Sequence, residues 1–185
     1  MRRISHVVIP ICVDILWRLR PYAVSTNRPS PSPLSTEEDP ADTAEVEALR
    51  ALIRRFPYWV KGRALLAAKS LAVNDVATAY AEAQALLILA PKNSHYCATA
   101  LFELGRCFLR RGDAASALAF LDQALELTPN STLVQEERSA ALVLLGDKGR
   151  ALDVLKAIDP LELSAEGKAA LQWLSHERSS TPASS

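Results

Sequence analysis

Apolar residues recur at helical spacing along most of the chain, from about residue 43 to residue 177. Leucines and alanines return there every three or four positions, which places them on one face of an α-helix. Four prolines divide this stretch at intervals of 34, 38 and 31 residues. Because proline cannot continue the hydrogen bonding of a helix, each of them marks a helix end. The pattern predicts an all-α fold with helix boundaries at Pro57, Pro91, Pro129 and Pro160.

A second series of short turns falls between the prolines with nearly the same period, 38 and then 34 residues. Each turn is a glycine or asparagine followed by aspartate. The first residue tolerates the left-handed backbone of a tight turn, and the aspartate can cap the next helix. Two independent series with one period predict a repeated unit of helix, turn, helix and loop, and therefore a short α-solenoid. The turns are Asn74-Asp75, Gly112-Asp113 and Gly146-Asp147.

One stretch of the chain carries the whole unit and resembles the tetratricopeptide repeat, a helix-turn-helix motif of 34 residues. In that family large apolar, small and proline residues stand at set positions, and every one of these positions is acceptably filled here. The resemblance implies stacked helix pairs that present a surface to another molecule rather than a catalytic centre. The matching positions are Leu101, Leu104, Gly105, Phe108, Gly112, Ala117, Leu121, Ala124 and Pro129.

The flanking units are recognisable but degraded. The unit before has small residues at two large positions, and the unit after reaches Pro160 three residues early. Residues 42–56 resemble the second helix of a truncated unit, and residues 164–177 resemble a closing helix. We therefore expect about three units plus this closing helix. Trp59 and Trp173 are expected to pack in the core, because a buried aromatic side chain supplies much of the area of a small interface.

The chain outside the repeats divides into three parts. Residues 1–24 form a basic and apolar segment, residues 25–42 a linker rich in proline and serine, and residues 178–185 a polar tail. The linker and the tail have too little apolar content to fold, so we expect both to be disordered. The repeat domain is expected to occupy residues 43–177.

The N-terminal segment admits several interpretations. Its apolar run, from Val7 to Leu16, is shorter than the ~20 residues that span a membrane. A secretory signal is disfavoured because Pro10 and Asp14 interrupt the run. Apolar residues at helical spacing between basic ends are typical of an interfacial helix that lies on a membrane. The alternatives are a short segment that docks on the array and residues upstream of the true start codon.

Charge and cysteine content narrow the range of functions. Lys and Arg balance Asp and Glu at 21 each, so no net positive charge is available for a general nucleic-acid role. The three cysteines argue against a disulfide framework and for a reducing compartment. We therefore expect a cytoplasmic protein without a nucleic-acid partner, with peripheral membrane contact through residues 1–24 as the alternative.

Motifs of enzyme chemistry do not stand out in the sequence. It has no glycine-rich phosphate loop, nucleophile elbow or zincin motif. His95, Cys97 and Cys107 come nearest to a metal site, but structural zinc needs a closed set of four ligands and no second pair exists. Buried cysteines that act as small apolar residues are the better interpretation. We predict a non-enzymatic protein without cofactor or metal.

The resemblance also implies that the first helix of each unit lines a concave groove, and it selects candidate residues there. Phe102, Arg106 and Arg110 share one helix face, which sets an apolar contact beside two guanidinium groups. Arginine offers paired donors to a carboxylate, so this face could hold an acidic group of a peptide. A solvated face whose arginines serve solubility is the alternative. The candidate partner-binding residues are Lys61, Phe102, Arg106, Arg110 and Glu136.

Together these observations predict a small bacterial adaptor or scaffold that binds a peptide or helix of a partner in its groove. The chaperone-tail clamp known in the family is not expected, because Ala64, Ala68 and Phe102 stand where polar residues would be needed. One alternative is a membrane-tethered subunit of an envelope, secretion or pilus assembly complex. Another is an accessory domain detached from a larger enzyme. The oligomeric state is left open.

Overall fold

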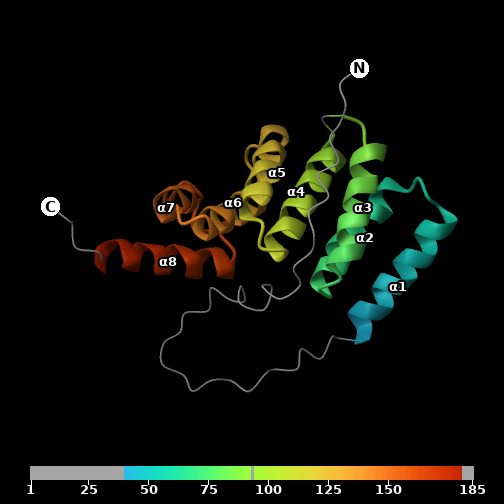
Figure 1. The fold of residues 1–185 in the computed structure, drawn as a ribbon, viewed down its shortest axis with the longest axis horizontal. Helices are drawn as coiled ribbons and strands as arrows, with labels where there is room; N and C mark the ends of the chain where they lie inside the picture. The colour runs from blue at the N-terminus through green and yellow to red at the C-terminus, as the bar shows by residue number, and fades with distance from the viewer. Residues whose placement is uncertain (1–39, 93, 181–185) are drawn as a thin grey trace.

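The computed structural model describes residues 40–92 and 94–180, and these residues form eight helices (Figure 1). The N-terminal segment, the linker up to residue 39 and residues 181–185 lie outside the described residues. Helical structure extends three residues beyond each end of the expected domain. The helices are α1 (Pro40–Arg55), α2 (Val60–Ala72), α3 (Val76–Leu89), α4 (His95–Arg110), α5 (Ala114–Leu127), α6 (Thr132–Leu144), α7 (Lys148–Lys156) and α8 (Ala165–Ser180).

The helices stack side by side in chain order, from α1 at one end to α8 at the other (Figure 1). Each helix packs mainly on its neighbours in sequence, and α4 also contacts α2 and α6. The pairs α2/α3, α4/α5 and α6/α7 are the three predicted units. Helix α1 is the half unit before them, and α8 closes the array. The prediction of an all-α solenoid is confirmed for the described residues.

The tight turns form as the sequence predicts. Asn74, Gly112 and Gly146 have φ values of 60°, 75° and 84°, the left-handed region that glycine and asparagine tolerate. In the third turn the side chain of Asp147 accepts a hydrogen bond from the backbone N–H of Arg150 at 3.1 Å. The other two aspartates cap α3 and α5 in the same way at 3.0 Å. Each turn thus ends one helix and starts the next.

Small residues bring paired helices close together. Ala79, Ala117 and Ala151 are completely buried, each at a crossing of two helices of one unit. A Cβ atom added to Gly105 would lie 2.7 Å from Cγ of Leu121, so α4 and α5 could not keep this separation with a larger residue. Close packing of α4 against α5 therefore explains why a glycine occupies the interior of α4.

The two tryptophans of the repeat domain differ in their surroundings. Trp173 is partly buried against the cluster at the α7/α8 end, as expected of a residue that anchors the closing helix. Leu174 beside it is 2% exposed. The prediction of a core position for Trp59 is wrong, because this side chain is 38% exposed. Its ring lies over Gly62 in the first turn of α2, at the surface of the array.

Candidate partner-binding surfaces

The first helices of the three units, α2, α4 and α6, adjoin one another through α4. Their exposed sides are called the first-helix face below. All five candidate residues lie on these three helices. The structure brings Phe102 and Arg106 into contact, with the guanidinium carbon 5.5 Å from the centre of the ring. The five side chains differ in their contacts and exposure, and the sequence spacing alone does not predict these differences.

Arg106 is held by two carboxylates of the same molecule. Its Nη1 lies 3.2 Å from Oε2 of Glu103, one turn earlier on α4. Its Nε lies 3.2 Å from Oε1 of Glu137 on α6. The guanidinium group therefore joins two units across the first-helix face. An arginine in two ion pairs has fewer donors left for a partner, so Arg106 acts first as a link within the array.

Glu103 is a buried acid that the sequence analysis did not single out. Its side chain is 4% exposed, and burial raises its pKa although Arg106 opposes that shift. Burial also raises the pKa of Glu137, against the effect of Arg106 and Arg110, but that side chain is 33% exposed. Glu103 and Glu137 occupy equivalent positions 34 residues apart. That equivalence, together with the arginine between them, is the signal that could have revealed the cluster.

Arg110 and Lys61 remain available at the surface. Both side chains are exposed, Arg110 as the last residue of α4 and Lys61 in the first turn of α2. Neither forms a salt bridge to any residue that the structure describes. Phe102 lies half-buried on α4. The first-helix face therefore offers an apolar ring with separate positive charges.

Glu136 serves to seat the closing helix. One oxygen of its carboxylate accepts a hydrogen bond from the backbone N–H of Ser164 at 2.7 Å, and the other accepts one from the Ser164 hydroxyl at 2.6 Å. A Cβ atom on Gly167 would lie 2.6 Å from the same carboxylate. Helix α8 thus lies close against α6. Leu133, Ala140 and Val143 of α6 line a hollow between α6 and α8.

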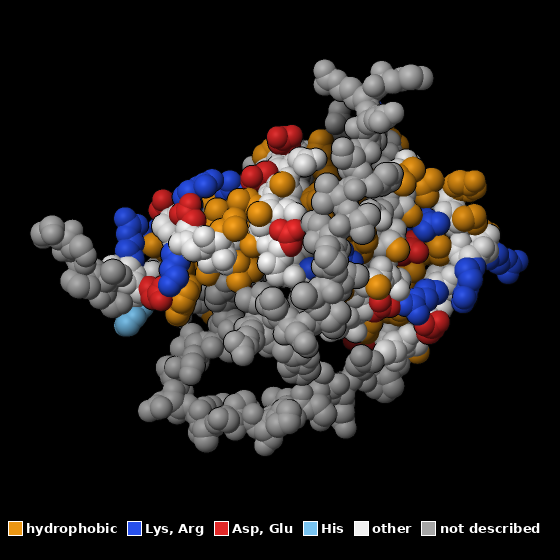
Figure 2. Space-filling view, in the orientation of Figure 1, with side chains coloured by type: hydrophobic (Ala, Val, Ile, Leu, Met, Phe, Trp, Pro, Cys, Tyr) orange, Lys and Arg blue, Asp and Glu red, His pale blue; other side chains and the backbone are white. Residues whose placement is uncertain are grey.

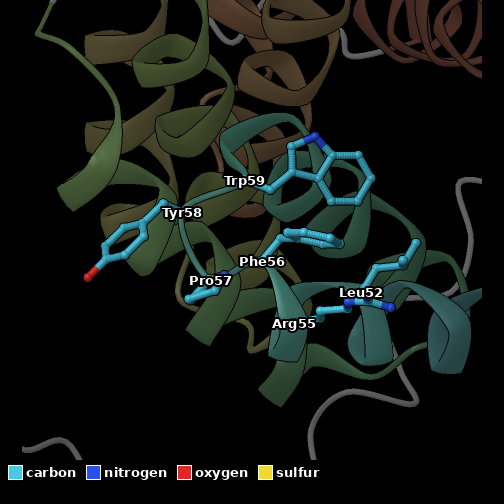
Figure 3. Close-up of a pocket in the computed structure, with 6 residues that line it drawn as sticks. All are labelled: Leu52, Arg55, Phe56, Pro57, Tyr58 and Trp59. Carbon is cyan, nitrogen blue, oxygen red and sulfur yellow. The ribbon is translucent and has the colours of Figure 1, made fainter.

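A second surface lies at the other end of the array. Leu52, Phe56, Pro57, Tyr58 and Trp59 line an apolar hollow where α1 ends and α2 begins, and we call these five residues the aromatic end patch (Figure 3). Leu52, Phe56 and Trp59 gather on one side of it, whereas Tyr58 points away. Sequence analysis missed this surface. Its signal was four bulky residues in succession directly after a truncated unit.

The described part of the chain contains no group of His, Cys, Asp or Glu side chains arranged to hold a metal ion. Cys97 and Cys107 lie on the same helix and are free. Burial raises the pKa of the Cys107 thiol to about 11, which keeps it protonated and unreactive at neutral pH. Within residues 40–180, apart from residue 93, no helix is both long and apolar enough to cross a membrane.

Comparison with known proteins agrees with this architecture. Residues 98–131 match the family model of the tetratricopeptide repeat. A thermophilic TPR protein of Thermus thermophilus, TTC0263, has a similar structure, with a TM-score of 0.64 at 20% identity over 74% of each chain. A crystal structure of MamA is similar with a TM-score of 0.60 at 14% identity, over 75% of this chain and 79% of that one. No curated protein shows significant sequence similarity.

The stacked helix pairs and the exposed first-helix face give the described residues the fold of a helical-repeat protein. Residues 98–131 match the tetratricopeptide repeat, and the described helices have the fold of solved tetratricopeptide-repeat proteins. Proteins of this kind generally bind other proteins and act as adaptors rather than as enzymes.

Proposed function

We propose that the protein is a non-enzymatic adaptor that binds a short segment of a partner protein on its first-helix face. Phe102 supplies the apolar contact, and Arg110 and Lys61 attract acidic groups on either side of it. The observation that carries this proposal is the exposed guanidinium group of Arg110, which has no salt-bridge partner among the described residues. An arginine available on the same helix as a half-buried aromatic ring suits a segment in which an apolar residue lies near a carboxylate.

The two other candidate residues, Arg106 and Glu136, support this contact by holding helices in place. Arg106 pairs with Glu103 of its own helix and holds α4 to α6 through Glu137, which supports the position of Phe102. Glu136 holds the N-terminal end of α8, so α8 limits the open part of the face to α2, α4 and the near side of α6. A surface of this length accommodates a brief segment of a partner rather than a whole domain.

Selection from a displayed peptide library on the immobilised full chain tests the proposal. We expect the protein to enrich peptides in which an acidic residue lies near a large apolar one. The double variant Phe102→Ala/Arg110→Glu should lose them, because it removes the apolar contact and reverses the charge. Lys156→Glu is the matched control, since this exposed lysine ends α7, a second helix of its unit.

Helical content measured by circular dichroism should be the same for the double variant and the control. Enrichment of the same peptides by the wild-type chain and the double variant would contradict binding at the first-helix face. Failure of the wild-type chain to enrich any sequence would contradict recognition of short segments altogether.

A further inference from the structure

Helix α1 exposes an apolar position that is buried in the complete units. Leu52 stands five residues before Pro57, as Leu86 does before Pro91 and Ala124 before Pro129. Leu86 and Ala124 are completely buried, whereas Leu52 is 42% exposed. The difference therefore lies in what surrounds the position, because all three residues are apolar.

The neighbours of Leu86 show what Leu52 lacks. Leu86 packs with Val60 and Ala64 of α2, the first helix of its own unit, and with Ala100 of α4, the first helix of the next unit. Helix α1 has a following first helix, α2, and buries Val46, Leu49 and Ile53 in the adjoining cluster. The described residues contain no first helix for the unit of α1, so the side of α1 that carries Leu52 has no helix against it.

The exposed surface continues from Leu52 along the loop. Phe56 is 51% exposed and Tyr58 79% exposed, and apolar side chains protrude beside basic ones at this end of the molecule (Figure 2). The loop is fixed in place, because Nε of Arg63 donates a hydrogen bond to the carbonyl oxygen of Pro57 at 2.9 Å and the same side chain pairs with Glu82. Contiguous exposed apolar surface that is held rigidly is typical of an interaction site.

The chain itself supplies an apolar segment of matching character, although Pro10 interrupts its helical pattern. Ile4, Val7, Val8, Ile11, Ile15 and Leu19 recur at helical spacing in the residues that precede α1. We propose that residues 4–19 dock in cis on the aromatic end patch and the neighbouring side of α1, in the place of the missing first helix. This inference is independent of binding at the first-helix face.

Chain length permits this placement. The residues between position 19 and α1 can extend over roughly 65 Å at about 3.3 Å per residue. A helix of the length of α1 is about 24 Å long at 1.5 Å per residue. The segment can therefore reach either end of α1 and lie antiparallel to it, as the first helix of a unit lies against the second.

Opposite charges favour an antiparallel arrangement of residues 4–19 and α1 at the N-terminal end of α1. Arg18 and Arg20, at the C-terminal end of the segment, would then lie near the start of α1. Glu45 and Glu47 there already pair with Lys69 and Arg50, but their side chains remain 44% and 62% exposed. At the other end, the apolar residues of the segment would meet Leu52 and Phe56. Arg2 and Arg3 would approach Arg54 and Arg55 there, so the apolar contacts must outweigh that repulsion.

A disulfide trapping experiment on the full chain tests the placement with the native Cys12. This residue precedes Ile15 and Leu19 by three and seven positions and so shares their helix face. Ala48, an exposed residue one turn before Leu52, is replaced in the variant Ala48→Cys. The matched control is Ala119→Cys, an equally exposed alanine of α5. Peptide mass mapping identifies the bond formed under mild oxidation.

We expect the bond from Cys12 to position 48 to form within one chain, on the order of tenfold faster than the bond to position 119, because docking raises the local concentration. Adding Leu52→Asp to the Ala48→Cys chain should remove this preference, while a circular dichroism spectrum shows that the helices remain. Cys107 is buried, whereas Cys97 is half-buried, so any bond to Cys97 is distinguished from the bond to position 48 by the mass map.

Three results would overturn the proposal. Equal rates at positions 48 and 119 would show that the segment is not held at α1. A bond that joins two chains would assign the patch to a second copy of the protein. Sedimentation of the full chain with phosphatidylglycerol vesicles, lost in Leu52→Asp, together with equal disulfide rates, would assign it to a membrane surface.

Discussion

At the scale of the residue, Gly105 shows how one missing side chain sets the distance between two helices. A Cβ atom there would lie 2.7 Å from Cγ and 2.9 Å from Cδ2 of Leu121, which is itself completely buried. Gly149, in α7, is different, because the nearest atom to an added Cβ is 4.0 Å away.

We expect Gly105→Ala to lower the free energy of unfolding by about 1–2 kcal/mol, because overpacking outweighs the gain in helix propensity of about 1 kcal/mol. Gly149→Ala should instead leave it unchanged or raise it, since nothing opposes the gain in propensity. Urea unfolding followed by circular dichroism measures both. A stabilised Gly105→Ala protein would show that α4 and α5 can separate without loss of packing.

At the scale of the element, α8 is attached by a polar contact as well as by its apolar side. The carboxylate of Glu136 accepts hydrogen bonds from the backbone and the side chain of Ser164, just before α8 begins. Lys148 of α7 also pairs with Glu177 of α8 at 2.6 Å. The second contact is more exposed, and salt bridges at the surface contribute little to stability.

Glu136→Ala should loosen α8 before it affects the rest of the array. Loss of each of the two hydrogen bonds to this charged acceptor should cost about 1.5–3 kcal/mol. We expect faster hydrogen exchange in residues 165–178, with unchanged exchange in α4 and α5. Glu126→Ala, which removes an exposed carboxylate from α5, is the control and should leave α8 protected. Uniformly faster exchange in Glu136→Ala would contradict a local role for this carboxylate.

At the scale of the whole molecule, the cluster of Glu103, Arg106 and Glu137 makes stability depend on pH. Burial raises the pKa of Glu103 in the folded protein above its ordinary value of 4.5. Between these two pKa values the folded protein binds more protons than the unfolded chain does. The free energy of unfolding contributed by this group therefore falls as pH rises through that interval.

We predict that this cluster contributes more to the free energy of unfolding of the array near pH 5 than at pH 7. Glu103→Gln should reduce the difference, because it removes the main group that takes up the proton. Urea unfolding at the two pH values checks this, with Glu126→Gln as a control that should keep the wild-type dependence. An equal pH dependence in Glu103→Gln and wild type would show that the burial of Glu103 does not control stability.

The turns and the helix ends of the whole array could be predicted from the sequence. The turns at Asn74, Gly112 and Gly146 and the helix ends near the loop prolines are local features. Backbone conformations with positive φ select glycine or asparagine, and proline stops a helix whatever surrounds it. Repetition of these signals was sufficient to predict stacked helix pairs and a closing helix.

The candidate site was less accessible to prediction. Arg106 has the same residue type and helix face as Arg110, yet Glu137 from the next unit holds it. Glu136 appears on the same face, yet Ser164 before α8 occupies its carboxylate. Trp59 has a large aromatic side chain of the kind that is usually buried, but it lies at the surface in the loop between α1 and α2. For the two charged residues the deciding partner comes from a distant part of the chain, Glu137 for Arg106 and Ser164 for Glu136.

The sequence by itself determined the helices, their turns and their order in the array, because these depend on periodicity and on backbone conformations set within a few residues. Only the tertiary structure decided which charges are paired and which apolar residues are covered. Both depend on side chains brought together from separate units. Leu52 shows the distinction, since it is apolar like its equivalents Leu86 and Ala124 and is exposed because no described helix lies against its side of α1.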